Sequence, residues 1–481
     1  MSTEKRDQST STSQNDQSNQ GTSLSTLVFT IIRGAFAIVT IVVVVLIWSS
    51  VSVAAEEVGS AAEWQPAKTI LMHTPKEELF LGVIEPEAAL FEDTFSTDRA
   101  TREHEDYIEA LAESAGATVV TLEEKLLLLG ARSELINLAT SNLAVNGEDN
   151  ILQFEEDCSG DNCFTQAEKE KREECFNDKL TKLGSRELVR IALQRPKIIL
   201  RKDPIGPNDK SEDNCEVAAG YEVAADYKLN PLMNMYFMRD QMITTAKGVV
   251  IGKMARVQRR NETELVKIAL EQMGIQPIYE IVGEGRLEGG DFIPAGDRVF
   301  IGNGLRTNEE AVKQMLTNDV FGDSHPDVIV VKDSWLNQQE MHLDTHFNII
   351  DEDLVVMEEE RYDRDCTPPP DGNSKCLLAD VWKWDNDSAE YNKSEEGVNF
   401  VKLLEEELGF TIIPVSIANQ EAYGINFLTV GPKEIMMVKG ISPEYQKDLE
   451  DRGVTIHLID FDNLKLGYGA AHCTTQVLHR E

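Results

Sequence analysis

One local order of elements recurs along this chain: two β-rich segments, an amphipathic helix and a further β-rich segment. The two longest copies occupy residues 289–331 and 346–415, and a compact third copy begins at Ile425. Looser copies begin at Thr69 and around Val249. Repeated units of this kind usually assemble about a pseudo-symmetry axis and bind ligands at the centre. The sequence therefore predicts an α/β protein of five ββαβ units with a central site.

Two insertions interrupt this repeat. Residues 122–229 are charged, follow a mostly helical pattern and contain four cysteines, so we expect a helical lobe there. Residues 361–396 are rich in proline, aspartate and asparagine, which favours a surface loop. We therefore expect one large domain over residues 60–481, with these two insertions in it.

The N-terminal region differs from the rest of the chain. Residues 1–26 are a Ser/Thr/Gln/Asn-rich tract with too few apolar side chains for a core, and we expect a disordered arm. Residues 27–55 hold a strongly apolar run that suits a signal peptide or a signal anchor. Arg33 before this run favours a cytoplasmic N-terminus. The expected chain is exported, either anchored in a membrane by a single span or secreted.

The seven cysteines divide into six and one. Six of them lie in the two insertions, where an oxidising compartment would let them form three disulfides. Cys366 and Cys376 are the obvious close pair. The other four leave three pairings open, those of Cys158, Cys163, Cys175 and Cys215. Cys473 is the odd cysteine, and its position in a glycine-lined turn beside a histidine predicts a free nucleophile.

Composition narrows the choice of partners. The chain has 84 acidic residues against 46 Lys and Arg, a formal net charge of −38, so nucleic acid is excluded as a partner. A negative field would concentrate small cations, although the same charge would also suit a well-solvated surface. Asn261, Asn386 and Asn392 begin glycosylation sequons and predict a glycoprotein if the chain is exported. The sequence does not give the oligomeric state.

Four polar motifs lie just before strands of the repeat, where strand ends converge. Together they offer a nucleophile, an acid/base, an orienting carboxylate and anions for a cation. Singly, each has a structural explanation: a local ion pair, a tight turn whose glycines adopt positive φ, or a structural His–Asp pair. The motifs are Arg239-Asp240, Glu288-Gly-Gly-Asp291, His342-Leu-Asp344 and the Cys473 turn, in which His472 is expected to be structural.

Seven segments, spread over about 400 residues, give this chain a resemblance to a known family. It resembles the arginine deiminases, within the guanidino-group-modifying superfamily that also includes amidinotransferases and dimethylarginine hydrolases. The resemblance implies a five-fold pseudosymmetric ββαβ propeller, the pentein fold, with a helical insertion. The segments are ILMHTPKEEL (70–79), LFEDTFSTDRATREHEDY (90–107), MYFMRD (235–240), EGGDF (288–292), IGNGLRTNEEAV (301–312), MHLDTHF (341–347) and GYGAAHCTT (467–475).

Carried over by position, the resemblance implies a covalent mechanism without a metal or an organic cofactor. Cys473 would be the nucleophile, His342 the general acid/base and Glu288 the carboxylate that orients it. Asp240 and Asp344 would grip a small cationic guanidino substrate. Ammonia would leave first, and water would then release a ureido product, citrulline if the substrate is arginine. The imidazolium and the bound cation are expected to lower the pKa of Cys473.

One departure from the family pattern bears on the substrate. Related deiminases carry an arginine five residues before the cysteine that helps to bind the substrate carboxylate, and this chain has Tyr468 there. Arg306, Arg259 and Arg260 are the candidates to bind a carboxylate instead, and we expect Arg306 to bind substrate.

Three other functions remain open at this point. An amidinotransferase would pass the amidino group to an amine rather than to water. A metallohydrolase could use His342, Asp344 and His346, which share one strand face at two-residue spacing. An inactive binding protein could keep the fold, although all five catalytic positions are filled.

Overall fold

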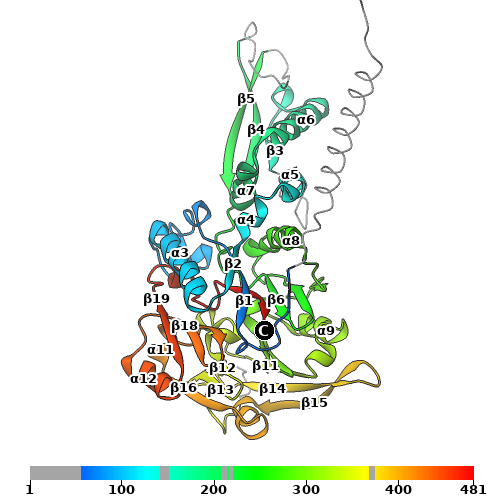
Figure 1. Cartoon of the computed structure of the whole chain (residues 1–481). Helices are drawn as coiled ribbons and strands as arrows, with labels where there is room; N and C mark the ends of the chain where they lie inside the picture. Colours follow the sequence, from blue (N-terminus) through cyan, green and yellow to red (C-terminus); the bar gives the residue numbers. More distant parts are fainter. Residues whose placement is uncertain (1–55, 141–150, 207–214, 216–219, 368–373) are drawn as a thin grey trace, which may run out of the picture. The chain divides into compact units, whose positions relative to one another are not determined.

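The structure is a computed structural model (Figure 1). It describes residues 56–140, 151–206, 215, 220–367 and 374–481.

Five three-stranded arrangements repeat the same connection within the described residues. In each, the middle strand pairs antiparallel with one neighbour and parallel with the other. A parallel pair requires a crossover, and a helical segment supplies it each time. The predicted α/β class and the ββαβ order are therefore confirmed.

The five units have the following elements in chain order. Unit 1 comprises β1 (Ala67–Met72), α3 (Thr97–Ser114), β2 (Thr118–Thr121) and β20 (Gln476–Arg480). Unit 2 comprises β6 (Met242–Thr245), β7 (Gly248–Ile251), α8 (Glu262–Gln272) and β8 (Tyr279–Glu280). Unit 3 comprises β9 (Phe292–Ala295), β10 (Arg298–Asn303), α9 (Glu309–Thr317) and β11 (Asp327–Lys332). Unit 4 comprises β12 (Phe347–Asp351), β13 (Leu354–Glu358), α10 (Phe400–Lys402) with the π-turn Leu403–Glu407, and β16 (Thr411–Val415). Unit 5 comprises β17 (Leu428–Gly431), β18 (Glu434–Val438), α12 (Pro443–Asp451) and β19 (Thr455–Ile459).

Unit 1 is completed by the two ends of the described chain. Its antiparallel strand is β20, which pairs with β1 across about the whole length of the protein. The sequence repeat did not show this strand, because no β-rich segment precedes Thr69 at the expected spacing. The pairing fixes the turn that carries Cys473, which ends just before β20.

Consecutive units are joined by bonds from buried polar side chains. The Asn348 side chain on β12 donates to the carbonyls of Ile425 and Phe427 ahead of β17, at 2.8 Å each. The hydroxyl of Thr429 on β17 donates back to the Ile349 carbonyl at 2.6 Å. Because these groups are buried, their mutual hydrogen bonds fix units 4 and 5 against each other.

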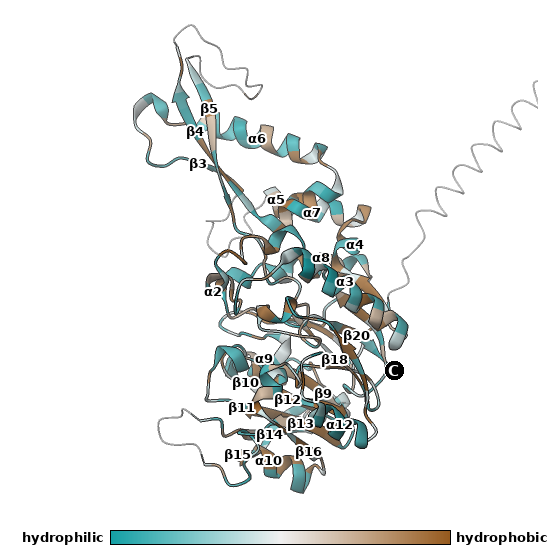
Figure 2. Ribbon diagram, turned by 90° about the vertical axis from the view of Figure 1, so that its left-hand side faces the viewer, coloured by the Kyte–Doolittle hydropathy of each residue, from teal (hydrophilic) through white to brown (hydrophobic). Residues whose placement is uncertain are grey.

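Hydrophobic strands account for most of the core, and Figure 2 shows the hydrophobic colour concentrated on them. Phe300 on β10 is fully buried and packs edge-on to Phe347 and Phe400, with ring centroids 5.4 and 5.7 Å apart. Phe410 lies 6.2 Å from the same ring. These rings join the cores of units 3 and 4, since Phe300 belongs to one and its partners to the other.

The first insertion contains a sheet as well as helices. Its helices are α4 (Leu122–Leu126), α5 (Arg132–Thr140), α6 (Gln166–Lys182) and α7 (Ser185–Gln194). A sheet of β3 (Leu152–Phe154), β4 (Pro196–Pro204) and β5 (Tyr221–Leu229) accompanies them. The helical expectation for 122–229 was thus incomplete. Five of the nine side chains of β5 are exposed, among them Glu222, Asp226 and Lys228, and these charged residues obscured the strand signal.

The second insertion was wrongly expected to be a surface loop. Within 361–396, β14 (Leu378–Asp385) and β15 (Glu390–Asn399) extend the sheet of unit 3 to five strands, and Figure 1 shows them as a long hairpin. Val381, Lys383 and Asp385 alternate with Trp382 and Trp384, and this period-two alternation is a strand signal. The turn-forming composition around it obscured the signal.

All six insertion cysteines pair. Cys366 bonds to Cys376, as predicted. Of the three pairings left open for the other four, the structure has Cys158 with Cys163 and Cys175 with Cys215. Cys473 is buried and free.

The predicted localisation is contradicted. Among the residues that the structure describes, no helix combines the length and the apolar character needed to cross a membrane. The disordered arm expected at residues 1–26 and the apolar segment at 27–55 lie outside those residues. The expectation of an exported chain, anchored or secreted, is therefore withdrawn. Glycosylation at the three sequons depended on export and is withdrawn with it.

The aromatic junction between units 3 and 4 gives a stability prediction. Phe300→Ala should lower the free energy of unfolding by about 3–5 kcal/mol, because it opens a cavity between buried rings. Urea unfolding followed by tryptophan fluorescence measures this. Phe80→Ala is the matched control, since Phe80 is 60 % exposed and should change the free energy by about 0.5 kcal/mol or less. Equal effects of the two substitutions would contradict the assignment of this junction to the core.

Candidate active site

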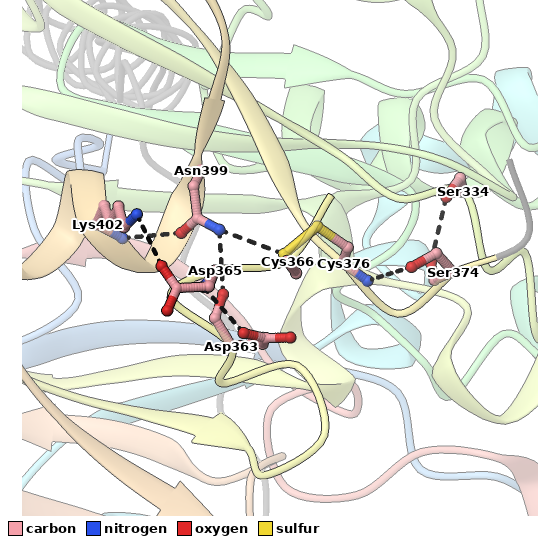
Figure 3. The surroundings of a disulfide bond; sticks show 8 residues. All are labelled: Ser334, Asp363, Asp365, Cys366, Ser374, Cys376, Asn399 and Lys402. Carbon is pink, nitrogen blue, oxygen red and sulfur yellow. Dashed lines mark hydrogen bonds and ion pairs between the residues drawn. A yellow bond between two sulfur atoms is a disulfide. The ribbon is translucent and has the colours of Figure 1, made fainter. Parts of the chain in front are cut away.

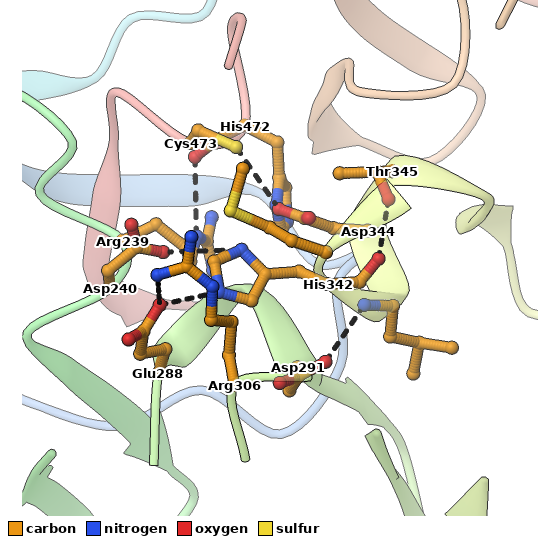
Figure 4. Close-up of polar contacts among 12 residues, drawn as sticks. Arg239, Asp240, Glu288, Asp291, Arg306, His342, Asp344, Thr345, His472 and Cys473 are labelled. Atoms are coloured by element: carbon orange, nitrogen blue, oxygen red, sulfur yellow. Dashed lines mark hydrogen bonds and ion pairs between the residues drawn. The ribbon is translucent and has the colours of Figure 1, made fainter. Parts of the chain in front are cut away.

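In every unit, a polar or nucleophilic residue lies just before the strand that pairs antiparallel with the middle strand, and these five positions meet. Sequence reasoning found four of the five and missed Asn426. The residues are Asp240 before β6, Glu288 before β9, His342 before β12, Asn426 before β17 and Cys473 before β20. Asp344, two residues after His342, joins them (Figure 4). The repeat thus delivers one side chain from each unit to a common place.

A small cavity opens at this meeting point. Asp240, Arg306, His342, Tyr468 and Cys473 line it. Glu288 and Asp344 lie immediately behind, bonded to His342 and to the turn of Cys473 respectively. The structure therefore brings together all six residues predicted to form the site.

His342 is held as a cation. Its Nε2 lies 2.8 Å from Glu288 Oε2, and its Nδ1 lies 3.7 Å from Asp240 Oδ1. Burial favours the neutral ring, but Asp240 and the hydrogen bond with Glu288 outweigh it and raise the pKa of His342 to about 9. Glu288 is also buried, yet His342 and Arg306 hold its pKa well below the usual range. The pair is therefore an imidazolium beside a carboxylate at neutral pH.

Asp240 and Asp344 each have one oxygen that accepts a hydrogen bond and one that accepts none from the described residues, although Asp240 Oδ1 lies 3.7 Å from His342 Nδ1. Asp240 Oδ2 accepts from Arg259 Nη1 at 2.7 Å, and Asp344 Oδ2 accepts from His472 Nδ1 at 2.7 Å. Their Oδ1 atoms are buried and have no hydrogen-bond partner within the described parts of the chain. Because an unsatisfied buried carboxylate oxygen is costly, both sites favour an incoming N–H donor, and a cation most of all.

Cys473 lies between carboxylates. Its Sγ donates to Asp344 Oδ2 over 3.6 Å. Burial, Asp344 and Asp240 together raise the pKa of the Cys473 thiol well above its usual value. In the protein alone, burial and the two carboxylates therefore set the direction of the shift. The predicted lowering, which included a bound cation, stays a prediction for the substrate complex.

Asn426 organises the cysteine turn. Its Oδ1 accepts from the backbone amides of Ala470 and Cys473 at 3.0 and 3.3 Å, and its Nδ2 donates to the Asp344 carbonyl at 3.2 Å. This asparagine ties the nucleophile's turn to the segment that carries Asp344. Its place in the repeat, two residues before β17, was the signal that could have identified it.

His472 is structural, as expected, but it acts on a site residue. Besides Asp344, it lies 3.6 Å from Glu63 Oε1. Glu63 also pairs with Arg239 at 3.4 Å and with Arg480. The local ion pair expected between Arg239 and its neighbour Asp240 is absent among the described contacts, since Arg239 turns toward Glu63 instead. This buried network fixes the residues next to the cavity from behind.

The two glycines of the Glu288 motif allow neighbouring groups to lie directly against the backbone of the motif. Neither Gly289 nor Gly290 has a positive φ, contrary to the tight-turn explanation. A Cβ on Gly289 would lie 1.9 Å from the Arg239 carbonyl oxygen, and one on Gly290 would lie 2.6 Å from His342 Nδ1. The motif therefore lets His342 pass directly over the backbone.

The three candidate arginines differ. Arg306 is buried, donates from Nη2 to Gln338 Oε1 at 2.9 Å, and has Nη1 3.5 Å from Glu288; its Nε has no hydrogen bond to any described residue. Arg259 lines the cavity but is held by Asp240 and by Glu262 at 2.9 Å. Arg260 does not line it. Arg306 is thus the one of the three with a donor to spare at the cavity.

The metal site considered from the sequence does not form. In the described part of the chain, His342, Asp344 and His346 are not among the clusters whose ligand atoms converge. Asp240, Glu288 and His342 do converge within 4.8 Å. Arg259 and Arg306 contact the two carboxylates of that cluster, so protein cations already balance them.

Comparisons with known proteins agree with the motifs. The family model described as arginine deiminase matches residues 87–480. The arginine deiminase of Halobacterium salinarum is 25 % identical over 88 % of this chain and 97 % of its own length, and that of Streptococcus gordonii is 24 % identical over 86 % and 96 %. A solved dimethylarginine dimethylaminohydrolase adduct covers 85 % of this chain and 99 % of its own, at 14 % identity and a TM-score of 0.46.

These matches define a class first: the chain is a hydrolase that acts on C–N bonds of guanidino groups. Within that class, it belongs to the arginine deiminase family.

The close approach at Gly290 gives a catalytic prediction. Gly290→Ala should lower kcat/KM for guanidino hydrolysis by about 10²-fold, because the new Cβ displaces the His342 ring. Gly431→Ala on β17 is the control, since its Cβ would meet Glu434 at an ordinary 3.6 Å. Steady-state kinetics of both variants checks this, and equal activity would refute close approach as the reason for this glycine.

Proposed function

We propose that this protein hydrolyses the guanidino group of arginine to citrulline and ammonia through a covalent intermediate on Cys473. One observation carries the proposal: two buried carboxylates, each with one free oxygen, flank a buried cysteine sulfur at a single cavity. That arrangement complements a planar cation whose central carbon reacts with sulfur.

Substrate binding follows from the free donors and acceptors. The guanidinium would donate to Asp240 Oδ1 and Asp344 Oδ1, which lack other hydrogen bonds among the described residues. The free Nε of Arg306 would hold the substrate carboxylate. The relatives are named for arginine as their substrate. Free arginine has a guanidinium at one end and a carboxylate at the other, which matches the two carboxylates and Arg306. Tyr468 lines the cavity beside Cys473 with a left-handed backbone, φ 66°, between two glycines.

Binding would also activate the nucleophile. In the protein alone, Asp240 and Asp344 keep the Cys473 thiol protonated. A bound guanidinium neutralises both carboxylates, so their repulsion of a thiolate disappears and the thiol loses its proton to solvent water. The thiolate then forms where its target carbon is held.

His342 would move the protons. The thiolate attacks the guanidinium carbon, and the C–N bond breaks as the His342 imidazolium gives its proton to the departing ammonia. The ring, now neutral and oriented by Glu288, takes a proton from water, which attacks the same carbon. The C–S bond then breaks, the hydroxyl proton of the adduct passes to solvent water, and citrulline and the Cys473 thiolate are released. A pKa near 9 suits the first step, since His342 starts as an acid.

We further propose that the five units close into a five-fold pseudosymmetric propeller around this cavity. The meeting of all five strand entrances and the bonds between consecutive units support it. The catalytic domain would then be residues 60–481, with 122–229 and 361–396 as insertions that contain none of the site residues.

The first experiment measures products from the full-length chain. Incubation with arginine should release ammonia and citrulline in equal amounts, and Cys473→Ser should lower the rate by about 10⁴-fold or more, because the nucleophile is lost. Silence with arginine and with other guanidines, but turnover when an amine acceptor is added, would instead indicate an amidinotransferase. Full activity of Cys473→Ser would refute the covalent mechanism.

A second experiment tests the raised pKa of Cys473. Iodoacetamide reacts with the thiolate, so alkylation of the substrate-free protein should be slow at pH 7 and should rise only in the alkaline range above pH 9. Asp240→Asn removes one carboxylate from the thiol's field and should make alkylation faster at every pH below that range. Asp323→Asn, an exposed carboxylate, is the control. An alkylation midpoint at or below 8.5 would contradict this charge arrangement.

A further inference from the structure

A short segment, Gln338–His342, contributes residues to one face of the cavity. At one end Gln338 holds Arg306, and at the other His342 faces Cys473 across the cavity. Glu340 lies between them and is buried, and it is not among the residues that line the cavity. Whatever holds Glu340 therefore fixes both the arginine partner and the acid/base residue.

Two cations hold Glu340. Arg361 Nε donates to Glu340 Oε2 at 2.7 Å, and Lys375 Nζ lies 3.1 Å from Glu340 Oε1. Arg361 is fully buried and also binds Asp333 at 3.1 Å. Lys375 adds contacts to Glu358 at 3.3 Å and Glu360 at 3.0 Å.

Lys375 comes from the second insertion, next to Cys376. The Cys366–Cys376 disulfide closes this insertion directly beside the lysine. Figure 3 shows how both of its ends are attached. Asn399 Nδ2 donates to Cys366 Sγ at 3.2 Å, and the Ser334 hydroxyl donates to the Ser374 carbonyl at 3.2 Å. The lysine is therefore held in place by a covalent closure on one side and a hydrogen bond on the other.

We propose that Lys375 is a positioning residue for the segment Gln338–His342 and that the Cys366–Cys376 disulfide is the redox-sensitive closure that keeps it there. The proposal rests on the proposed function, because it concerns the same cavity. A dithiol reductant would supply two electrons and two protons, break the S–S bond, leave two thiols and become a disulfide itself. Cys473 is already a thiol and would be unchanged.

The physical consequence is an imbalance of charge behind the cavity. Without Lys375, the neighbouring carboxylates Glu340 and Glu358 would repel each other, with Arg361 as the cation that remains on Glu340. The segment would loosen, and Gln338 would hold Arg306 less firmly. Because Arg306 is proposed to bind the substrate carboxylate, KM should rise more than kcat falls.

The role of the Lys375 charge is tested with three variants of the full-length chain. Lys375→Met should raise KM for arginine by about 3- to 30-fold with a smaller change in kcat, and Lys375→Arg should restore KM to within about 3-fold of wild type. Lys393→Met is the matched control, because Lys393 also pairs with two carboxylates, Asp380 and Glu396, but on β15. A Lys375→Met variant with the KM of Lys393→Met would overturn the proposal.

The closure is tested by comparing disulfides. Cys366→Ser/Cys376→Ser should reproduce the KM increase and speed amide hydrogen exchange in residues 338–346, whereas Cys158→Ser/Cys163→Ser in the first insertion should do neither. Dithiothreitol should change wild type in the same way as the first double variant. Unchanged exchange and KM in that double variant would refute the closure. Hydrogen exchange is measured without turnover, so it separates the two proposals. If wild type does not hydrolyse arginine but loss of the Cys366–Cys376 disulfide still speeds exchange in residues 338–346, the proposed function is refuted and the positioning role of the disulfide is upheld.

Discussion

Buried negative charge is the condition on which this structure depends. Four carboxylates at or directly behind the cavity are almost fully buried: Glu63, Asp240, Glu288 and Asp344. Buried carboxylates persist only when cations or hydrogen bonds compensate them. The compensation comes from Arg239, Arg259, Arg306, Arg480, His342 and His472. It stops short at two oxygens, one each on Asp240 and Asp344, and a guanidinium would complete it.

The repeat explains how such a charge arrangement can be rigid. In each unit a loop ends at the same point, just before the strand that pairs antiparallel with the middle strand, so five backbone segments fix five side chains independently. Cross-links such as Asn426 to the Cys473 turn then join neighbouring units. A site built on strand entrances needs little rearrangement to bind its ligand, which favours catalysis by preorganised charge.

The sequence predicted those parts that local pattern determines. The ββαβ order and the polar residues before four strands were visible because hydrophobic periodicity and short motifs are local. Strand β20 was missed, since its partner β1 is about 400 residues away and pairing leaves no local trace. Asn426 and Glu63 were missed for a related reason: their roles come from partners in other units. The β14–β15 hairpin was taken for a loop because its exposed face is polar.

The direction of the Cys473 pKa shift depends on burial and on charges that only the fold brings together. The sequence analysis expected the imidazolium and a bound cation to lower this pKa, but in the protein alone His472 bonds to Asp344, and the Asp344 carboxylate faces the sulfur. A thiol kept protonated by its neighbours reacts slowly in disulfide exchange, since the thiolate is the attacking species. The same carboxylates that would bind the substrate therefore also slow disulfide exchange between Cys473, which is free, and the six cysteines that pair. The thiolate nucleophile would form only once the cation is bound.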